Sequence, residues 1–286
     1  MTNKNNKNIN KDIKEKNILK VGMIQMEVVP GDVAANHARA EDLIRIAAAK
    51  GAKVITLPEL WNCGYRLEKL ESLAEHTDVT KSKSLSLLSR LAAEYGIYIF
   101  GGSIAEKKNG KYYNTAVVFN DCGEIIQKYR KAHLFQLGLR EPEYFTPGGE
   151  WSLVDTPWGR VGLVICYDLR FPELWRNLVL RGAKIIVCPA QWPTARLYSW
   201  RALNIARAIE NEAFVISTNR TGEDDYLYPG NSLLIDPRGR LVADGGETEG
   251  VLLAELDLDL LADDVYRLGM IQERRPILDE IDDTQI

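Results

Sequence analysis

Short apolar runs rich in valine and isoleucine recur along the chain, and most of them lack the alternation of a strand with one solvated face. Runs of this kind are typical of strands covered on both faces. We therefore expect strands at residues 19–26, 53–58, 97–102, 115–120, 161–166, 184–189, 213–219, 232–236 and 250–256.

Amphipathic segments separate several of these runs. Residues 34–50 place Leu43, Ile46 and Ala47 on one helical face, and residues 82–95 present a similar apolar stripe. A further helix is expected at residues 199–211. Because such helices cover sheets with their apolar faces, strands and helices in alternation favour an α/β fold.

One pattern occurs twice, as "GAKVITLPE" at residues 51–59 and as "GAKIIVCPA" at residues 182–190. Glycine suits the left-handed end of a helix, and proline stops a strand. The repeat predicts two similar helix–strand units within one domain, residues 18–286, because no Pro/Ser-rich linker divides this range. Residues 1–17 are rich in Asn and Lys, and we expect a disordered polar tail there.

Composition excludes several classes of protein. The 286-residue chain is 45% hydrophobic and 27% charged, with a formal net charge of −4, which is ordinary for a soluble globular protein. It lacks the basic excess of nucleic-acid binders, and no apolar run approaches the roughly 20 residues of a membrane helix. With no export signal visible either, we expect a cytoplasmic protein without nucleic-acid or membrane partners.

The cysteines are too widely spaced for a zinc motif. The closest two of the four, Cys166 and Cys188, are 22 positions apart, and the chain has only three histidines. We therefore expect no structural metal site. In a reducing compartment these cysteines are expected to be free thiols.

Three chemically useful side chains stand at or just after predicted strands. Glu59 follows the strand 53–58, Cys166 ends the strand 161–166, and Lys131 comes soon after a predicted hairpin, "NDCGEIIQ". Ligand sites of α/β sheets lie at the carboxyl ends of strands. Taken singly, each residue is more often structural: a packed thiol, a helix-capping carboxylate or a solvated lysine.

Together these residues make an acyl-transfer set. A thiol with a pKa of about 8.5 needs a base or a nearby cation before it attacks. Glu59 could accept the proton of Cys166, and Lys131 could stabilise the oxyanion that forms on attack. No histidine is required, and His133 is expected to have a structural, hydrogen-bonding role.

Around these residues the chain resembles the nitrilase superfamily of carbon–nitrogen hydrolases, over about residues 18–275. The blocks that carry the resemblance are "LPELWNCGY" (57–65), "YRKAHLF" (129–135) and "ICYDLRFPEL" (165–174). The resemblance implies an α-β-β-α sandwich, a homodimer or larger homo-oligomer, and a Glu-Lys-Cys triad at Glu59, Lys131 and Cys166.

The resemblance also implies a second active-site glutamate. Glu141 and Glu143 both precede the Pro147-Gly148 turn, and the spacing favours Glu141. The implied reaction passes through a thioester on Cys166, with the backbone N–H of Tyr167 as an oxyanion donor. Asp168 and Arg170 are expected to brace the turn, and neither a metal ion nor an organic cofactor is required.

Residues 188–222 look most like the omega-amidase-like branch, which hydrolyses the terminal amide of small dicarboxylic acid monoamides such as 2-oxoglutaramate or succinamate. Such a substrate keeps a carboxylate, for which Arg196 is our candidate partner. Tyr65, Trp192 and Trp200 could wall the pocket. Alternative functions are an amidase for deaminated glutathione or N-carbamoyl compounds, a non-catalytic scaffold of the same fold, or a redox thiol protein.

Overall fold

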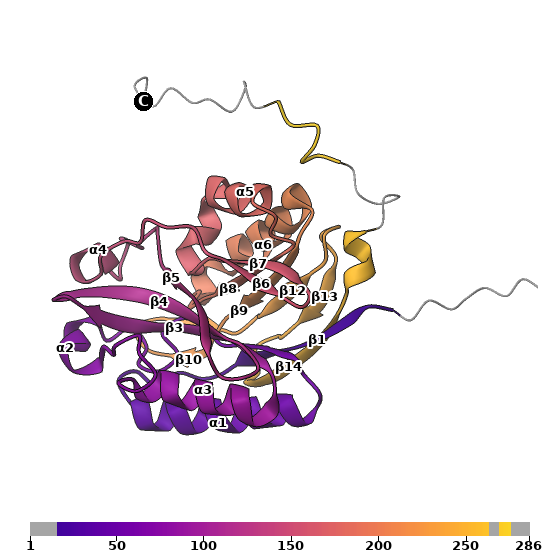
Figure 1. Cartoon of the computed structure of the whole chain (residues 1–286). Helices are drawn as coiled ribbons and strands as arrows, with labels where there is room; N and C mark the ends of the chain where they lie inside the picture. Colours follow the sequence, from indigo (N-terminus) through magenta and orange to yellow (C-terminus); the bar gives the residue numbers. More distant parts are fainter. Residues whose placement is uncertain (1–15, 263–268, 276–286) are drawn as a thin grey trace, which may run out of the picture.

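Two stacked sheets with helices on their outer faces form the body of the protein. The computed structural model describes residues 16–262 and 269–275, so most of the predicted polar tail, residues 1–15, lies outside the described residues. Figure 1 shows α1 and α3 below the stacked sheets and α5 and α6 above them. The α-β-β-α sandwich implied by the sequence resemblance is confirmed.

The two six-stranded sheets share one plan. Their orders are β14-β1-β2-β3-β4-β5 and β13-β12-β9-β8-β7-β6, and in each sheet three adjacent strands run parallel, β1-β2-β3 and β7-β8-β9. The first sheet consists of β1 (Ile18–Gln25), β2 (Val54–Thr56), β3 (Tyr98–Lys108), β4 (Lys111–Phe119), β5 (Ile125–Arg130) and β14 (Gly250–Asp257). The second consists of β6 (Leu153–Thr156), β7 (Gly159–Leu163), β8 (Ile185–Pro189), β9 (Phe214–Thr218), β12 (Leu233–Ile235) and β13 (Leu241–Asp244).

The repeated sequence pattern produces equivalent strands. Its two copies supply β2 and β8, and each is the middle strand of a parallel trio. The glycines that open the copies, Gly51 and Gly182, have φ angles of +86° and +97°. This is the left-handed region that glycine adopts without steric cost, as the helix-end prediction required.

Helices α1, α3 and α6 begin and end close to where the sequence predicts. The long helices are α1 (Val33–Ala49), α3 (Lys83–Tyr95), α5 (Pro172–Leu180) and α6 (Leu197–Asn211), and the short ones are α2 (Leu70–Leu73) and α4 (Glu141–Tyr144). Turns of 3-10 helix lie at η1 (Leu67–Lys69), η2 (Cys166–Arg170), η3 (Thr194–Arg196) and η4 (Leu258–Leu261). The side chains of Asp32 and Ser82 cap α1 and α3 by accepting backbone N–H bonds of 3.0 Å.

Some elements differ from the sequence prediction. The predicted strands 97–102 and 115–120 are pieces of a longer hairpin, because β3 continues to Lys108 and β4 starts at Lys111. The paired outer ends of these two strands are polar, so a search for apolar runs did not detect them. Helix α5, strand β6 and the small separate hairpin of β10 (Thr221–Glu223) and β11 (Leu227–Pro229) were missed. Three-residue strands are too short to show a period.

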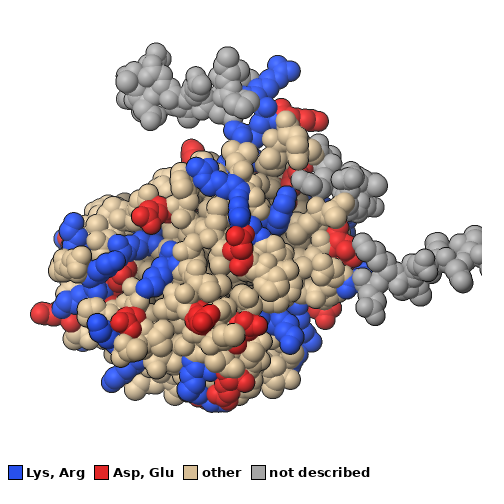
Figure 2. Space-filling view, viewed as in Figure 1, with Lys and Arg blue, Asp and Glu red and all other residues tan. Residues whose placement is uncertain are grey.

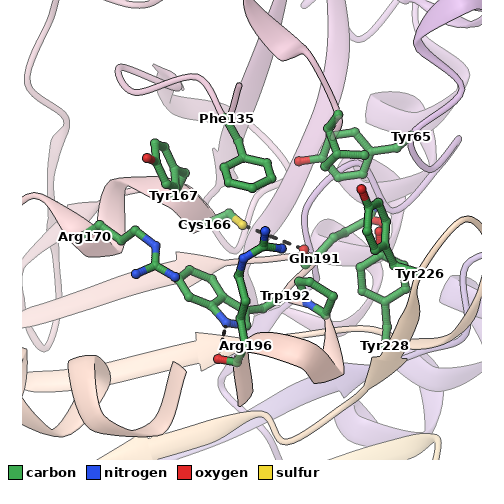
Figure 3. A pocket seen from close by; sticks show the side chains of 12 residues that line it. Tyr65, Phe135, Cys166, Tyr167, Arg170, Gln191, Trp192, Arg196, Tyr226 and Tyr228 are labelled. Carbon is green, nitrogen blue, oxygen red and sulfur yellow. Dashed lines mark hydrogen bonds between the residues drawn. The ribbon is translucent and has the colours of Figure 1, made fainter. Parts of the chain in front are cut away.

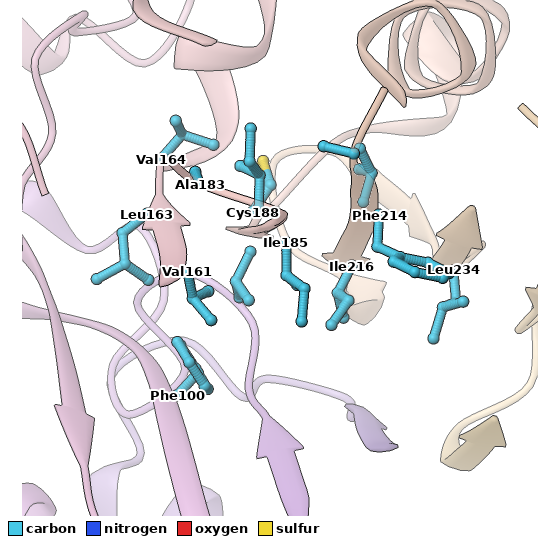
Figure 4. Close-up of a cluster of buried hydrophobic side chains, with 14 of the residues drawn as sticks. Phe100, Val161, Leu163, Val164, Ala183, Ile185, Cys188, Phe214, Ile216 and Leu234 are labelled. Atoms are coloured by element: carbon cyan, nitrogen blue, oxygen red, sulfur yellow. The ribbon is translucent and has the colours of Figure 1, made fainter. Parts of the chain in front are cut away.

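The core between the sheets holds the two layers in register. Figure 4 shows Phe100 of the first sheet facing Val161, Ile185 and Ile216 of the second, and all four are buried. At the carboxyl ends of β2 and β9 the sheets are also joined by a 2.5 Å hydrogen bond between the hydroxyls of Thr56 and Thr218. The strand ends of both sheets therefore open onto the same region.

Charged side chains cover the outer surface in mixed sign. Figure 2 shows basic and acidic residues interspersed over the face it draws. Along α1 and α3 several of them pair: Arg45 contacts Glu41 and Glu94, and Arg90 contacts the same two carboxylates. Exposed pairs of this kind contribute about 0–1 kcal/mol each, so the fold depends on its apolar layers.

Replacing Gly102 by Ala should destabilise the protein strongly. Gly102 sits in a bulge of β3 with φ +58°, and a Cβ there would lie 2.0 Å from the carbonyl oxygen of Pro58, directly before Glu59. Left-handed strain and overpacking together should lower the free energy of unfolding by about 2–5 kcal/mol. Urea unfolding followed by tryptophan fluorescence measures this loss.

Gly96→Ala is the matched control for this variant. Gly96 has φ +60° at the end of α3, but no atom lies within 4 Å of its added Cβ. In Gly96→Ala the free energy of unfolding should fall only by the cost of placing alanine in a left-handed conformation, about 1–2 kcal/mol. Equal losses in the two variants would contradict a steric role for Gly102 beneath Glu59.

Candidate active site

Glu59 is completely buried at the end of the chain segment that continues β2. Its Oε1 accepts hydrogen bonds of 2.8 Å from the Lys131 ammonium and from the side-chain amide of Asn114. Its Oε2 accepts the backbone N–H of Gln191 at 3.0 Å. Segments that follow β2, β5 and β8, together with β4, thus fix both oxygens of this carboxylate.

Lys131, the residue after β5, lies between two carboxylates. Its Nζ is 2.8 Å from Glu59 Oε1 and 2.8 Å from Glu141 Oε1, and all three side chains are fully buried. Burial opposes the charge of the ammonium, but Glu141 and Glu59 outweigh this, so the pKa of Lys131 is raised well above its usual value. Lys131 is therefore a permanent cation.

Of the two candidate second glutamates, Glu141 joins this cluster. Its Oε1 also accepts the hydroxyl of Tyr65 at 2.7 Å, and its Oε2 accepts the backbone N–H of Phe135 at 2.7 Å. Burial raises the pKa of Glu141, although the Lys131 ammonium acts against this. Glu143 points to the surface and pairs with Arg140.

Cys166 follows β7 in an unusual backbone conformation. Its φ is +46°, which is left-handed and strained for a residue with a side chain. The sulfur is nearly buried and lies 3.9 Å from the carbonyl oxygen of Gln191, the residue whose N–H holds Glu59. Burial and then Glu59 raise the pKa of the Cys166 thiol well above its usual value, against the opposing effect of Lys131. The resting sulfur therefore keeps its proton.

Asp168 connects the cysteine turn to the lysine loop. Its buried carboxylate accepts the N–H of Ile165 at 2.9 Å, the Tyr129 hydroxyl at 2.7 Å, and the backbone N–H and ring Nδ1–H of His133 at 2.9 and 2.8 Å. His133 in turn stacks on Phe171 with ring centres 3.6 Å apart. Both Asp168 and His133 thus occupy the structural positions that the sequence predicted.

A pocket opens above Cys166, and Figure 3 shows its walls. Tyr167 and Arg170 stand on one side of the cysteine, and Tyr65, Tyr226 and Tyr228 stand on the other. Residues lining the pocket are Tyr65, Phe135, Leu139, Cys166, Tyr167, Arg170, Gln191, Trp192, Pro193, Arg196, Tyr226 and Tyr228.

The predicted pocket residues divide into those that line it and one that does not. Tyr65, Tyr167, Trp192 and Arg196 all line the pocket. Trp200 does not, because its fully buried indole bonds to the carbonyl of Asn231 behind Trp192.

The backbone N–H of Tyr167 is placed to serve as a donor. Tyr167 directly follows Cys166 in η2, and its N–H precedes the first hydrogen bond of that turn, from Asp168 N–H to Ile165 O. That N–H is not consumed by the hydrogen bonds of the turn. An oxyanion formed on attack at Cys166 would thus have both this group and the Lys131 ammonium available.

Several contributors to the site were missed from the sequence. Asn114 is a buried amide inside the apolar strand β4, an exception to the strand pattern that could have drawn attention. Gln191 follows β8 at a strand end, the position that marked Glu59 and Cys166. Tyr226 and Tyr228 come from the unpredicted hairpin β10–β11, for which the sequence offered no periodic signal.

Neither a metal cluster nor a membrane helix is found in the described part of the chain. Within residues 16–262 and 269–275, no group of three or more His, Cys, Asp or Glu side chains is arranged to hold a metal ion. None of the helices described there is long and apolar enough to cross a membrane.

Known proteins match this chain over most of its length. A family model described as carbon-nitrogen hydrolase matches residues 20–265. The chain is 39% identical over 262 residues to 2-oxoglutaramate amidase of Bacillus subtilis (strain 168), covering 91% of this chain and 96% of that protein. Omega-amidase NIT2 of Homo sapiens is 34% identical over 267 residues, with coverages of 90% and 95%.

The solved structure of Saccharomyces cerevisiae Nit3, a member of branch 10 of the nitrilase superfamily, has the same fold. It superposes with a TM-score of 0.83 at 32% identity, covering 90% of this chain and 97% of that one. A carbon–nitrogen hydrolase superfamily protein of Xanthomonas campestris, solved with an arsenic adduct in its active site, also gives a TM-score of 0.83, at 29% identity.

The geometry predicts how the reactivity of Cys166 depends on pH. With Glu59 removing the thiol proton during attack, alkylation of Cys166 by iodoacetamide should change less than about threefold between pH 7 and 9. In Glu59→Gln the thiol must ionise unaided. Burial, the largest cause of its raised pKa, persists in this variant, so the rate should be low and climb about tenfold per pH unit with no plateau below pH 9. Mass spectrometry of the Cys166 peptide measures both profiles.

Glu143→Gln removes a surface carboxylate close to the site and serves as the control, with the wild-type profile expected. A wild-type profile that levels off near pH 8.5, as for a small free thiol, would contradict proton transfer to Glu59.

Proposed function

This chain belongs to the carbon–nitrogen hydrolase family, and on that basis we propose that it hydrolyses the terminal carboxamide of a small dicarboxylic acid monoamide through a thioester on Cys166. The family membership confirms the resemblance of its three sequence blocks. The observation that carries the proposal is the buried ion cluster of Glu59, Lys131 and Glu141 beside a protonated, strained cysteine.

Acylation begins at the Cys166 sulfur. Glu59 accepts the thiol proton as the sulfur attacks the amide carbon, and the carbonyl electron pair moves onto oxygen. The Lys131 ammonium and the Tyr167 N–H stabilise this oxyanion. When the carbonyl re-forms, the C–N bond breaks, and Glu59 returns its proton to the leaving nitrogen. The products of this half-reaction are ammonia and a Cys166 thioester.

Deacylation repeats these steps with water. Glu59 accepts a proton from water as it attacks the thioester, and the same two donors hold the second oxyanion. Collapse breaks the C–S bond, and the proton on Glu59 goes to the departing sulfur. Glu141 acts through Lys131: its carboxylate keeps the ammonium charged and in place, since a buried lysine alone would tend to lose its proton.

The pocket chemistry supports a substrate with an acidic end. Arg196 lines the pocket with its guanidinium over the ring of Phe135, at 5.0 Å from the ring centre. Arg170 is already engaged, since it bonds to the hydroxyl of Ser199 and stacks on Trp192. Arg196 is therefore the guanidinium that we assign to the substrate carboxylate, in line with the names of the relatives, 2-oxoglutaramate amidase and omega-amidase.

The assembly and location of the protein belong to the same proposal. We expect a homodimer or larger homo-oligomer in the cytoplasm. The oligomer follows from the resemblance to the nitrilase superfamily. Light scattering coupled to size exclusion measures the number of subunits.

Replacing Cys166 by Ala should reduce ammonia release at least about 10³-fold, because the covalent step is lost. The panel is 2-oxoglutaramate, succinamate, deaminated glutathione, N-carbamoyl-β-alanine and a simple nitrile. Release from the dicarboxylate monoamides alone supports the proposal. Cys122→Ala removes an exposed thiol and should keep wild-type activity, and circular dichroism checks that Cys166→Ala is folded. Normal turnover by Cys166→Ala would refute the thioester.

Replacing Arg196 by Gln should weaken binding of the substrate carboxylate while leaving the chemical step at the amide largely unchanged. A lost charge-assisted contact should lower kcat/KM for succinamate about 10- to 100-fold, chiefly by raising KM. Butyramide, in which a methyl group replaces the carboxylate, should change less than about threefold. Arg201→Gln alters the same residue type on α6 outside the pocket lining and serves as the control. Equal losses on both amides would rule out Arg196 as the carboxylate partner.

A further inference from the structure

The hydroxyl of Tyr228 is a buried polar group without a partner. Tyr228 is only 2% exposed and lines the pocket that contains Cys166. Among residues 16–262 and 269–275, no donor or acceptor lies within hydrogen-bond distance of its oxygen. A buried hydroxyl left without a partner costs about 1–3 kcal/mol, so a protein that keeps one in its pocket requires an explanation.

The other buried polar side chains of the pocket are paired with the protein itself. The Tyr65 hydroxyl donates to Glu141 at 2.7 Å. The Gln191 side chain donates to the Glu59 carbonyl at 2.7 Å and accepts from Arg220 at 3.1 Å. These side chains are committed to the Glu141 carboxylate, to the Glu59 backbone and to Arg220, whereas the Tyr228 hydroxyl is not committed to any partner among the described residues.

The ring and backbone of Tyr228 are both held by contacts with the surrounding chain. Its ring packs on the guanidinium of Arg220, with the ring centre 4.3 Å from the guanidinium carbon. Arg220 is fully buried and donates to the carbonyls of Thr221 and Val28, to Gln191, and to the carboxylate of Asp224. The backbone of Tyr228 pairs with Gly222 across the β10–β11 hairpin. The position of the unpaired hydroxyl is therefore set by the packing of Arg220 and the β10–β11 hairpin.

We propose that the Tyr228 hydroxyl is a specificity-determining contact, which donates a hydrogen bond to an acceptor oxygen at the acidic end of the bound amide. This inference rests on the proposed function. In the proposed mechanism the reacting amide already has its hydrogen-bond donors and its base. Lys131 and the Tyr167 N–H stabilise the oxyanion, and Glu59 transfers the proton. Tyr228 comes from the hairpin wall, on the other side of Cys166 from Tyr167 (Figure 3). Because these groups already serve the reacting amide, we assign the Tyr228 hydroxyl to the remainder of the substrate.

The protonation state of Tyr228 suits a donor. Burial and then the carboxylate of Asp224 raise the pKa of its hydroxyl, although the Arg220 guanidinium acts in the opposite direction. The phenol remains neutral and keeps its proton throughout the range in which an amidase is assayed. A neutral donor that lines the same pocket as Arg196 can bond to a carboxylate or keto oxygen but not to a methyl group.

The test is Tyr228→Phe, which removes one oxygen and preserves the ring that packs on Arg220. We expect kcat/KM for succinamate to fall about 10- to 100-fold while that for butyramide changes less than threefold, so that the preference for the acid shrinks. Tyr98→Phe removes a hydroxyl at the start of β3, outside the pocket lining, and should leave both rates unchanged.

Stability gives a second, independent readout. A hydroxyl that stabilised the fold would lower the urea midpoint when removed, whereas removal of an unpaired buried hydroxyl should leave the midpoint unchanged or raise it. A lowered midpoint, unchanged kinetics, or equal losses on both amides would overturn the assignment. If the wild-type protein itself shows no preference for succinamate over butyramide, the proposed function has failed. If that preference exists and survives in Tyr228→Phe, only this inference has failed.

Discussion

A lysine ammonium enclosed with two carboxylates, away from water, is the interaction on which the rest of the structure depends. An ion buried without partners would cost several kcal/mol, and removing one partner from such a group is far more damaging than never having built it. Lys131 and Glu59 come from strand ends of the first sheet, Glu141 from a short helix, and the supporting N–H of Gln191 from the second sheet. The fold brings the Lys131 ammonium to 2.8 Å from each carboxylate and the Gln191 nitrogen to 3.0 Å from Glu59.

Within this cluster the carboxylate of Glu59 acts most strongly on the cysteine. Together with burial, it keeps the Cys166 sulfur protonated at rest. In the mechanism that we propose, the nucleophile is formed only during attack, when Glu59 receives the proton and the substrate oxygen takes up negative charge beside Lys131. The left-handed turn at Cys166, braced by Asp168, sets the sulfur at the base of the pocket with the Tyr167 N–H next to it.

Reaction and selection are assigned to different parts of the chain. The groups that act on the amide extend from the two sheets, which cannot shift without unpacking the core. The walls that face the remainder of a substrate come from η3 and from the hairpin β10–β11, which belongs to neither sheet. Arg220 joins the two parts, because it bonds Gln191 on one side and underlies Tyr228 on the other. Substrate choice can therefore vary in these loops while the reacting groups stay in place.

The sequence by itself determined the layers and indicated the candidate reactive side chains, because both are local properties. Apolar runs, helical stripes and the repeated "GAK" units report burial and chain direction within a few residues. Glu59 and Cys166 could be singled out as charge and thiol at the ends of such runs. Only the tertiary structure decided between Glu141 and Glu143, since both stand in the same four-residue helix and the choice depends on which one meets Lys131. Asn114, Gln191 and Tyr228 likewise gain their meaning from segments far apart in the chain, whose approach is set by packing and leaves no mark in a local pattern.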